Sequence, residues 1–233
     1  MNEREQACDL PELGPEAYVR WRASDLGATT ERLERDLILQ LVGDVRARKV
    51  LDVGCGDGDL SLVLAKRGAA VTGVDASDVM IEAARARAKR EDIEVAFALA
   101  QAERLPFRAA QFDLVTAVTI LCFVKQAGPV FREVSRVLRP GGLFVIGELG
   151  KWSTWAVQRR IRAWLGSPLW RRGTANELRN LAQGAGLEVR AVRGAIYYPP
   201  IGAAARLLGP VDPALGRLGT FGAAFVALAA IKR

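Results

Sequence analysis

Histidine is absent from the 233 residues of this chain, and its absence excludes several kinds of active site. Without an imidazole the chain can form neither a Ser-His-Asp triad nor a histidine-ligated zinc or iron centre, and no histidine can act as a general base. Any proton transfer must therefore use a carboxylate, cysteine, tyrosine, lysine or a bound cofactor.

Cysteines and long apolar runs are also scarce. The three cysteines, Cys8, Cys55 and Cys122, form no CxxC pair and no metal-ligand spacing, so we expect reduced thiols and no metal site. The longest weakly polar run, 220–231, has 12 residues, whereas a membrane-spanning helix needs about 20. The first 16 residues are polar and acidic, so no signal peptide is expected. These features predict a cytoplasmic protein.

Lysine is the third scarce residue, with six among the 33 basic residues. The formal charge is +7, but an arginine bias is more typical of genomic base composition than of nucleic-acid recognition, so no nucleic-acid partner is expected. Residues 1–150 hold 20 basic and 23 acidic residues (net −3), whereas residues 151–233 hold 13 and 3 (net +10). The positive excess therefore belongs to the C-terminal third, which would suit an anionic acceptor or an anionic membrane surface.

Apolar strands and amphipathic helices alternate along the first 150 residues. Such alternation indicates right-handed βαβ crossovers and an α/β fold with a doubly wound, mostly parallel sheet and helices on both faces. The chain is long enough for one domain with a full core, spanning 1–233. Strands are expected at 49–54, 70–75, 93–99, 112–119, 142–149, 187–193 and 222–232, and helices at 28–45, 59–67, 78–90, 129–138 and 174–186, with a Gly/Pro/Ala-rich connection at 195–219.

A glycine-rich segment follows the first strand. It reads G-x-G-x-G from Gly54 to Gly58, and alternate glycines let a backbone turn tightly and approach a ligand closely. The dinucleotide fingerprint requires a third glycine where this chain has Asp59. Asp57 and Asp59 would repel a diphosphate at the start of the next helix, so the segment favours a cationic ligand.

Asp75 stands at the end of the second strand, 23 residues after Asp52. A carboxylate in this position can accept both hydroxyl groups of a ribose. Asp75 could instead cap the following helix, but Ser77 and Asp78 are better placed for that role. The glycine segment and Asp75 together therefore predict a nucleoside site.

Five segments in order resemble the class I S-adenosylmethionine-dependent methyltransferases, and in particular the ubiquinone/menaquinone-type methyltransferase domain. They are VLDVGCGDG, VTGVDAS, QAERLPF, FDLVTAVTILCFV and REVSRVLRPGGLFVIGE, within residues 48–149. The resemblance implies a seven-stranded Rossmann-like sheet whose last strand is antiparallel. It also implies S-adenosyl-L-methionine as cofactor and methyl transfer to a small apolar or aromatic acceptor, with a lid at 1–27, a cofactor core at 48–149 and a substrate cap at 151–221.

Cofactor contacts follow from the resemblance by position. The glycine segment would line the methionine part, Asp75 would bind the ribose, and Thr119 would lie near the sulfonium. Gln101 replaces the family's usual acid beside the adenine, although an amide oxygen could accept the same hydrogen bond. Cys55 is interpreted as a small packing residue within the loop. The implied cofactor residues are Asp52, Gly54, Cys55, Gly56, Gly58, Asp75, Ala76, Met80, Gln101, Ala102, Glu103 and Thr119.

A general base is useful for methyl transfer but not essential, because alignment with an activated leaving group supplies much of the acceleration. Glu148, at the end of the fifth strand, is the first candidate, followed by Tyr197 and Tyr198. Glu148 could instead cap the next segment or hold the cofactor-side loop. A thiolate or an activated carbon acceptor would need little base.

Substrate contacts are expected from two aromatic segments and from Cys122, which could line the pocket wall or, less simply, act as a nucleophile. Segment 151–172 could be a packed helix, an aromatic cap over a hydrophobic acceptor, or an interfacial membrane helix at which a lipid or quinone is methylated. The chain lacks the polar-Pro-Pro-aromatic tetrapeptide typical of DNA amino-methyltransferases. A non-catalytic cofactor-binding regulator stays open. The expected substrate residues are Tyr18, Trp21, Cys122, Trp152, Trp155 and Tyr198.

Overall fold

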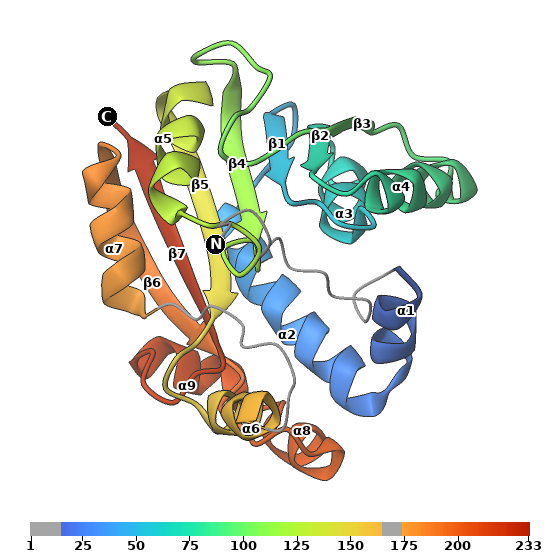
Figure 1. Ribbon diagram of the computed structural model, residues 1–233, viewed down its shortest axis with the longest axis vertical. Coiled ribbons are helices and arrows are strands. Elements are labelled where there is room, and N and C mark those ends of the chain that lie inside the picture. Colours follow the sequence, from blue (N-terminus) through green and yellow to red (C-terminus); the bar gives the residue numbers. More distant parts are fainter. Residues whose placement is uncertain (1–14, 165–173) are drawn as a thin grey trace, which may run out of the picture.

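A seven-stranded sheet organises the computed structural model, which describes residues 15–164 and 174–233. The strand order is β3-β2-β1-β4-β5-β7-β6, and β7 runs antiparallel to both of its neighbours while β1 to β5 pair in parallel. The predicted α/β fold with an antiparallel last strand is therefore confirmed (Figure 1). The strands are β1 (Lys49–Val53), β2 (Ala70–Asp75), β3 (Ala96–Leu99), β4 (Phe112–Val118), β5 (Leu138–Leu149), β6 (Leu187–Ala195) and β7 (Phe225–Lys232).

The helices match the expected positions within a few residues, with two exceptions. The N-terminal segment contains a helix, and the Gly/Pro/Ala-rich connection expected at 195–219 contains two helices of seven residues each. Pro213 suits the first turn of the second of these, because its fixed φ is already helical. The helices are α1 (Pro15–Ala23), α2 (Asp25–Val42), α3 (Asp59–Lys66), α4 (Asp78–Glu91), α5 (Ala127–Val137), α6 (Thr154–Trp164), α7 (Ala175–Gly184), α8 (Gly202–Leu208) and α9 (Asp212–Leu218).

Alternating side chains of the strands build two core layers. Val50 and Val145 pack on the face covered by α2 and α8, whereas Leu51 and Phe144 pack on the face covered by α5 and α7. Both faces of a parallel sheet are buried in this way, which explains the nearly continuous apolar runs of these strands.

Strand order reverses between β1 and β4, since the chain proceeds outward to β2 and β3 and then returns to the other side of β1. Ligands of doubly wound sheets bind in the crevice beyond the carboxyl ends of the strands at such a switch point. The glycine segment after β1, Asp75 at the end of β2 and Thr119 after β4 all lie at this edge.

A substitution at Gly147 in β5 tests how tightly β5 packs against β7. A Cβ at this position would overlap the ring of Phe225, a fully buried residue of the neighbouring strand β7. Gly147→Ala should therefore lower the free energy of unfolding by about 1–3 kcal/mol, as overpacked cores do. Urea denaturation measures the change.

Gly184→Ala is the matched control, because a Cβ at Gly184 would meet no atom within 4 Å. This substitution should leave stability unchanged or raise it slightly. Equal stability of the two variants would contradict the packing described for β5 and β7.

Candidate functional site

Three glycines after β1 adopt left-handed backbone conformations, with φ of 69° at Gly54, 54° at Gly56 and 80° at Gly58. A Cβ at Gly54 would overlap Ile120, so the loop after β1 packs directly against the loop after β4. By contrast, a Cβ at Gly56 would meet no protein atom within 4 Å. The backbone here leaves open space that a ligand could approach without a side chain in the way.

Asp75 holds this glycine loop in place. Its carboxylate accepts hydrogen bonds from the backbone N–H groups of Gly56 and Ser77, both at 2.9 Å. The segment after β3 lies beside it, because Ala100 donates its N–H to the carbonyl of Asp75 at 2.9 Å. The structure therefore brings residues 101–103, which were expected to contact the adenine, next to Asp75, which was expected to bind the ribose. Ala76 is exposed beside them, and Met80 is half-buried in the first turn of α4.

Asp52 is a buried residue that stabilises the strands around the site and does not face the open space over the glycine loop. Only 2 % of Asp52 is exposed, and its two carboxylate oxygens accept hydrogen bonds from Ser61 Oγ at 2.6 Å and Thr116 Oγ1 at 2.8 Å. Burial raises its pKa to about 6 despite these bonds. Cys55 is buried against Phe97 and Leu62, and burial raises the pKa of its thiol far above the usual range.

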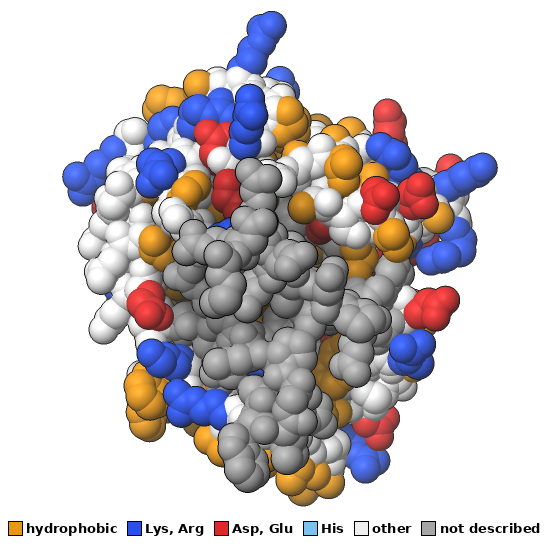
Figure 2. Space-filling model, viewed as in Figure 1, with side chains coloured by type: hydrophobic (Ala, Val, Ile, Leu, Met, Phe, Trp, Pro, Cys, Tyr) orange, Lys and Arg blue, Asp and Glu red, His pale blue; other side chains and the backbone are white. Residues whose placement is uncertain are grey.

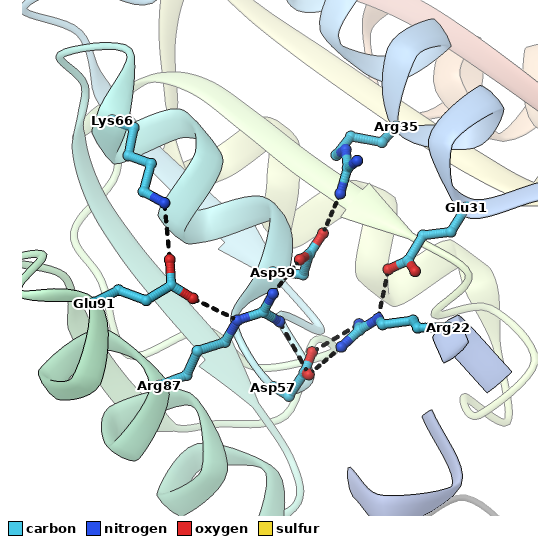
Figure 3. A network of polar contacts seen from close by, with 8 residues as sticks. All are labelled: Arg22, Glu31, Arg35, Asp57, Asp59, Lys66, Arg87 and Glu91. Carbon is cyan, nitrogen blue, oxygen red and sulfur yellow. Dashed lines mark hydrogen bonds and ion pairs between the residues drawn. The ribbon is translucent and has the colours of Figure 1, made fainter. Parts of the chain in front are cut away.

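The two acids at the end of the loop are already neutralised by arginines (Figure 3). Asp57 pairs with Arg22 and, at 3.1 Å, with Arg87. Asp59 pairs with Arg87 at 2.6 Å and with Arg35 at 3.2 Å. Burial disfavours the charge on Asp57, but the bonds and charges of Arg22 and Arg87 outweigh it and hold its pKa below the usual range. Both acids are therefore engaged by arginines of the protein, whereas the sequence indicated that they would be free to attract a cationic ligand.

This ion-pair network ties four helices to the glycine loop. Arg22 of α1 also bonds Glu31 of α2 at 2.6 Å, and Arg87 of α4 bonds Glu91 at 3.1 Å, which in turn bonds Lys66 of α3 at 2.8 Å (Figure 3). Among the described residues, the charges of its four cations and four carboxylates balance: Arg22, Glu31, Arg35, Asp57, Asp59, Lys66, Arg87 and Glu91.

A pocket of about 230 Å³ opens beyond the carboxyl ends of β4 and β5. The rings of Trp21 and Trp155 meet edge to face in its wall, with centroids 6.1 Å apart, and Trp155 Nε1 donates to the carbonyl of Tyr198 at 2.9 Å. Among the described residues the lining is Trp21, Thr30, Glu34, Thr119, Cys122, Phe123, Leu149, Trp155, Arg159, Ile196 and Ala224. Trp21, Trp155 and Cys122 were expected on the substrate side, and Thr119 near the sulfonium.

Three other residues expected at the site do not line this pocket. Tyr198 is fully buried, with its hydroxyl 3.0 Å from Thr30 Oγ1. Tyr197 donates its hydroxyl to the carbonyl of Gly219, and burial raises its pKa to about 12. Trp152 is 57 % exposed, with Lys151 Nζ 5.8 Å from its ring centroid. The Tyr18 side chain and residues 165–173 lie outside the described part of the chain.

Glu148, expected to act as a base, is a buried support of the loop after β4. It is 1 % exposed and accepts a hydrogen bond from the backbone N–H of Leu121 at 2.9 Å. The alternative that Glu148 holds the loop is the arrangement observed. Its side chain is not part of the pocket lining.

Two β-branched residues in the pocket wall have left-handed backbones, an uncommon and costly conformation. Thr119 has φ 53° and is held by its N–H bond to the carbonyl of Gly147 at 2.7 Å. Ile196 has φ 64°, and the buried carboxylate of Asp212 accepts its N–H at 2.8 Å and that of Tyr197 at 2.7 Å. Asp212 therefore fixes a wall residue from outside the pocket.

Glu34 and Arg159 are the charged groups in the pocket that the sequence analysis overlooked. A signal for Glu34 existed: it lies three and four residues before Leu37 and Ile38, so it falls on the apolar side of α2. Burial, followed by the nearby charge of Glu31, raises the Glu34 pKa to about 8, while Arg159 acts in the opposite direction. Within residues 15–164 and 174–233, no cluster of metal-ligating side chains is present.

Comparison with known proteins agrees with this architecture. A family described as a methyltransferase domain matches residues 51–146. The ubiquinone biosynthesis O-methyltransferase of Bordetella avium is 32 % identical over 176 residues, which cover 72 % of this chain and 73 % of that protein. The 27-O-demethylrifamycin SV methyltransferase of Amycolatopsis mediterranei is 35 % identical over 130 residues, covering 53 % and 48 %.

Solved structures share the fold over almost the whole chain. A methyltransferase of Thermotoga maritima superposes with a TM-score of 0.72 at 22 % identity, covering 94 % of this chain and 95 % of that one. The magnesium protoporphyrin IX methyltransferase of Synechocystis, solved with bound S-adenosylhomocysteine, gives a TM-score of 0.70 at 17 % identity, covering 95 % and 97 %. The chain thus belongs to the class I S-adenosylmethionine-dependent methyltransferases, enzymes that here transfer a methyl group from S-adenosylmethionine to a small-molecule acceptor.

Proposed function

We propose that this enzyme methylates a hydroxyl oxygen of a small aromatic molecule bound against the wall that Trp21 and Trp155 form. The observation that carries the proposal is the pocket itself: two indole rings and several aliphatic side chains enclose it, and Thr119 and Cys122 place it beside the cofactor edge of the sheet. Aromatic walls favour a flat apolar acceptor. The Bordetella relative is named an O-methyltransferase, which favours oxygen as the methylated atom.

The size of the pocket favours a small acceptor. Its volume of about 230 Å³, as bounded by the described residues, lies below the 300–1,000 Å³ typical of sites for drug-sized ligands. A single substituted ring would fill this space, and a larger acceptor would have to extend past its mouth.

For the cofactor, we propose that the glycine loop and Asp75 bind S-adenosylmethionine, whose sulfonium supplies an electrophilic methyl group. The open space over Gly56 fits a ligand that approaches the backbone closely. The Asp75 carboxylate, now bonded to two N–H groups, has further lone pairs with which to accept the ribose hydroxyls. Residues 101–103 would then lie beside the adenine.

In this arrangement the protein acts mainly by alignment. The left-handed Thr119 and the braced loop after β4 fix the boundary between the cofactor edge and the acceptor pocket. Holding two reactants in line in a fixed pocket can contribute roughly 7–11 kcal/mol to a displacement reaction. The aromatic wall would also exclude water from the acceptor.

Asp75→Ala tests the cofactor site. Loss of the carboxylate should weaken S-adenosylhomocysteine binding at least about tenfold, because it removes charge-assisted hydrogen bonds and releases the glycine loop. Isothermal titration calorimetry measures the affinity. Asp78→Ala, which removes an exposed carboxylate three residues later, should bind like the wild type. Equal affinity of all three proteins, or no binding by the wild type, would contradict the proposal.

As a second proposal, the surface of α6, α8 and α9 contacts an anionic membrane. Large apolar side chains are exposed there beside arginines: Leu207 is 78 %, Leu218 84 % and Phe221 87 % exposed, with Arg206 and Arg217 nearby in the chain. Figure 2 shows orange apolar and blue basic side chains next to one another at the lower left, where Figure 1 places α9. None of the helices in the described part of the chain is long and apolar enough to cross a membrane.

Charge complementarity favours an anionic bilayer as the partner of this surface. Of the three acids in residues 151–233, Asp212 is buried, and Glu177 and Glu188 lie on α7 and β6. Arg206 of α8 pairs with Asp25 of α2 at 3.6 Å, but both side chains are largely exposed. The surface thus combines exposed apolar side chains with an excess of cations, a combination that binds peripheral proteins to acidic lipids.

Vesicle co-sedimentation tests this contact. The wild type should sediment with phosphatidylglycerol vesicles and much less with phosphatidylcholine vesicles, and the double variant Leu207→Glu, Leu218→Glu should lose the binding. Val79→Glu, which changes an exposed apolar residue on α4, is the control and should sediment like the wild type. Absence of wild-type binding, or no effect of the double substitution, would exclude the membrane contact.

A further inference from the structure

Glu34 presents a carboxylate to the acceptor pocket. It lies on α2, one turn after Thr30, and lines the pocket with Trp21 and Trp155. Nothing in the described part of the chain donates a hydrogen bond to this carboxylate, although carboxylates in protein interiors are normally hydrogen-bonded. A half-buried carboxylate in this state is suited to receive a donor from a bound molecule.

The other candidate bases are engaged elsewhere or chemically unsuitable. Glu148 accepts from the Leu121 backbone, Tyr197 bonds Gly219, and Tyr198 bonds Thr30. Cys122 donates its thiol to the carbonyl of Thr119 at 3.1 Å. Arg159 remains protonated and cannot accept a proton. Glu34 is therefore the one carboxylate among the described residues that line the pocket.

We propose that Glu34 accepts a hydrogen bond from the acceptor's hydroxyl group and takes up its proton during methyl transfer. This inference rests on the proposed function. The proton passes from the hydroxyl oxygen to a Glu34 carboxylate oxygen, and a lone pair of the hydroxyl oxygen forms the new C–O bond. The electron pair of the breaking C–S bond stays on sulfur, which becomes a neutral thioether. The neutral Glu34 carboxyl then returns its proton to water.

The surroundings of Glu34 shift its pKa towards the range that suits a general base. Burial and the charge of Glu31 on α2 raise its pKa to about 8, Arg159 on α6 lowers it, and the ring of Tyr198 lies near enough to interact electrostatically. A general base is most effective when its pKa lies near the working pH. An aromatic hydroxyl rather than an ammonium group suits this pocket, because Arg159 would repel a cationic acceptor.

A pair of ligands in which a methyl group replaces the hydroxyl proton tests the hydrogen bond. We choose guaiacol and veratrole, measured by tryptophan fluorescence with saturating S-adenosylhomocysteine at a pH of about 9, where Glu34 is ionised and a phenol with a pKa of about 10 keeps its proton. The wild type should bind guaiacol about tenfold more tightly than veratrole, as a charge-assisted hydrogen bond predicts. Glu34→Ala should bind the two about equally.

Asp36→Ala is the matched control, since Asp36 is an exposed carboxylate on the same helix and should keep the wild-type preference. A preference for guaiacol that persists in Glu34→Ala, or is absent from the wild type, would overturn the assignment. Loss of S-adenosylhomocysteine binding in the wild type would instead overturn the proposed function, so the two failures are distinguishable.

Turnover of catechol tests the proton transfer. The wild-type rate should rise with pH and level off above a pH of about 8, and Glu34→Gln should lower it about a hundredfold and abolish that rise. Wild-type protein that binds S-adenosylhomocysteine but leaves catechol unmethylated would also overturn the inference.

Stability supplies a readout that does not depend on turnover. The folded protein holds the Glu34 proton up to a pH of about 8, whereas an ordinary glutamate releases it near 4.5. The unfolded chain therefore binds fewer protons between these values, and the contribution of Glu34 to stability is lost as the pH rises through that window. Glu34→Gln should lack this loss, and Asp36→Asn should retain it. Parallel stability profiles of wild type and Glu34→Gln would contradict the inference.

Discussion

The ion pair between Arg22 and Asp57 joins the two halves of the candidate site. Arg22 fixes α1 to the glycine loop, and the adjacent residue, Trp21, forms the pocket wall with Trp155. One short helix thus contacts both the cofactor edge and the acceptor pocket. If α1 moved away from the loop, the aromatic wall would open at the same time. Completion of the acceptor pocket is therefore coupled to the charge network around Asp57.

Buried and half-buried carboxylates do much of the positioning in this histidine-free protein. Asp52 holds β1 to α3 and β4, Asp75 holds the glycine loop, and Asp212 holds Ile196, each by two hydrogen bonds. Glu148 holds the loop after β4. Residues of this kind keep strained backbone in place before any ligand arrives, which is the arrangement required for catalysis by alignment. Glu34 differs from them because its carboxylate lines the acceptor pocket and accepts no hydrogen bond from any described residue.

The sheet and the cofactor edge were predictable because local patterns determine them. Apolar strand runs, the glycines after β1 and the acid ending β2 are short-range features, and their order identifies the family. The two helices after β6 were missed because each has only seven residues and their Gly, Pro and Ala content is typical of a loop. Their large apolar residues, such as Leu207 and Leu218, also remain exposed, so no amphipathic pattern marks these helices.

Side-chain partners across the fold could not be read from the sequence. In the sequence Asp57 and Asp59 have no cation nearby, but in the folded protein they pair with Arg22, Arg35 and Arg87 from three other helices. Likewise, the ends of strands identified Glu148 and Tyr197 as candidates for catalysis, but their long-range hydrogen bonds direct them to backbone groups.

Hydrogen exchange of Arg22→Ala tests the coupling between the two halves of the site most directly. Our account predicts that amides of α1 and of the glycine loop both exchange faster than in the wild type, and that S-adenosylhomocysteine binds more weakly. Arg20→Ala removes an exposed arginine on the same helix and should leave both unchanged. Wild-type protection of α1 and of the loop in Arg22→Ala would contradict the account.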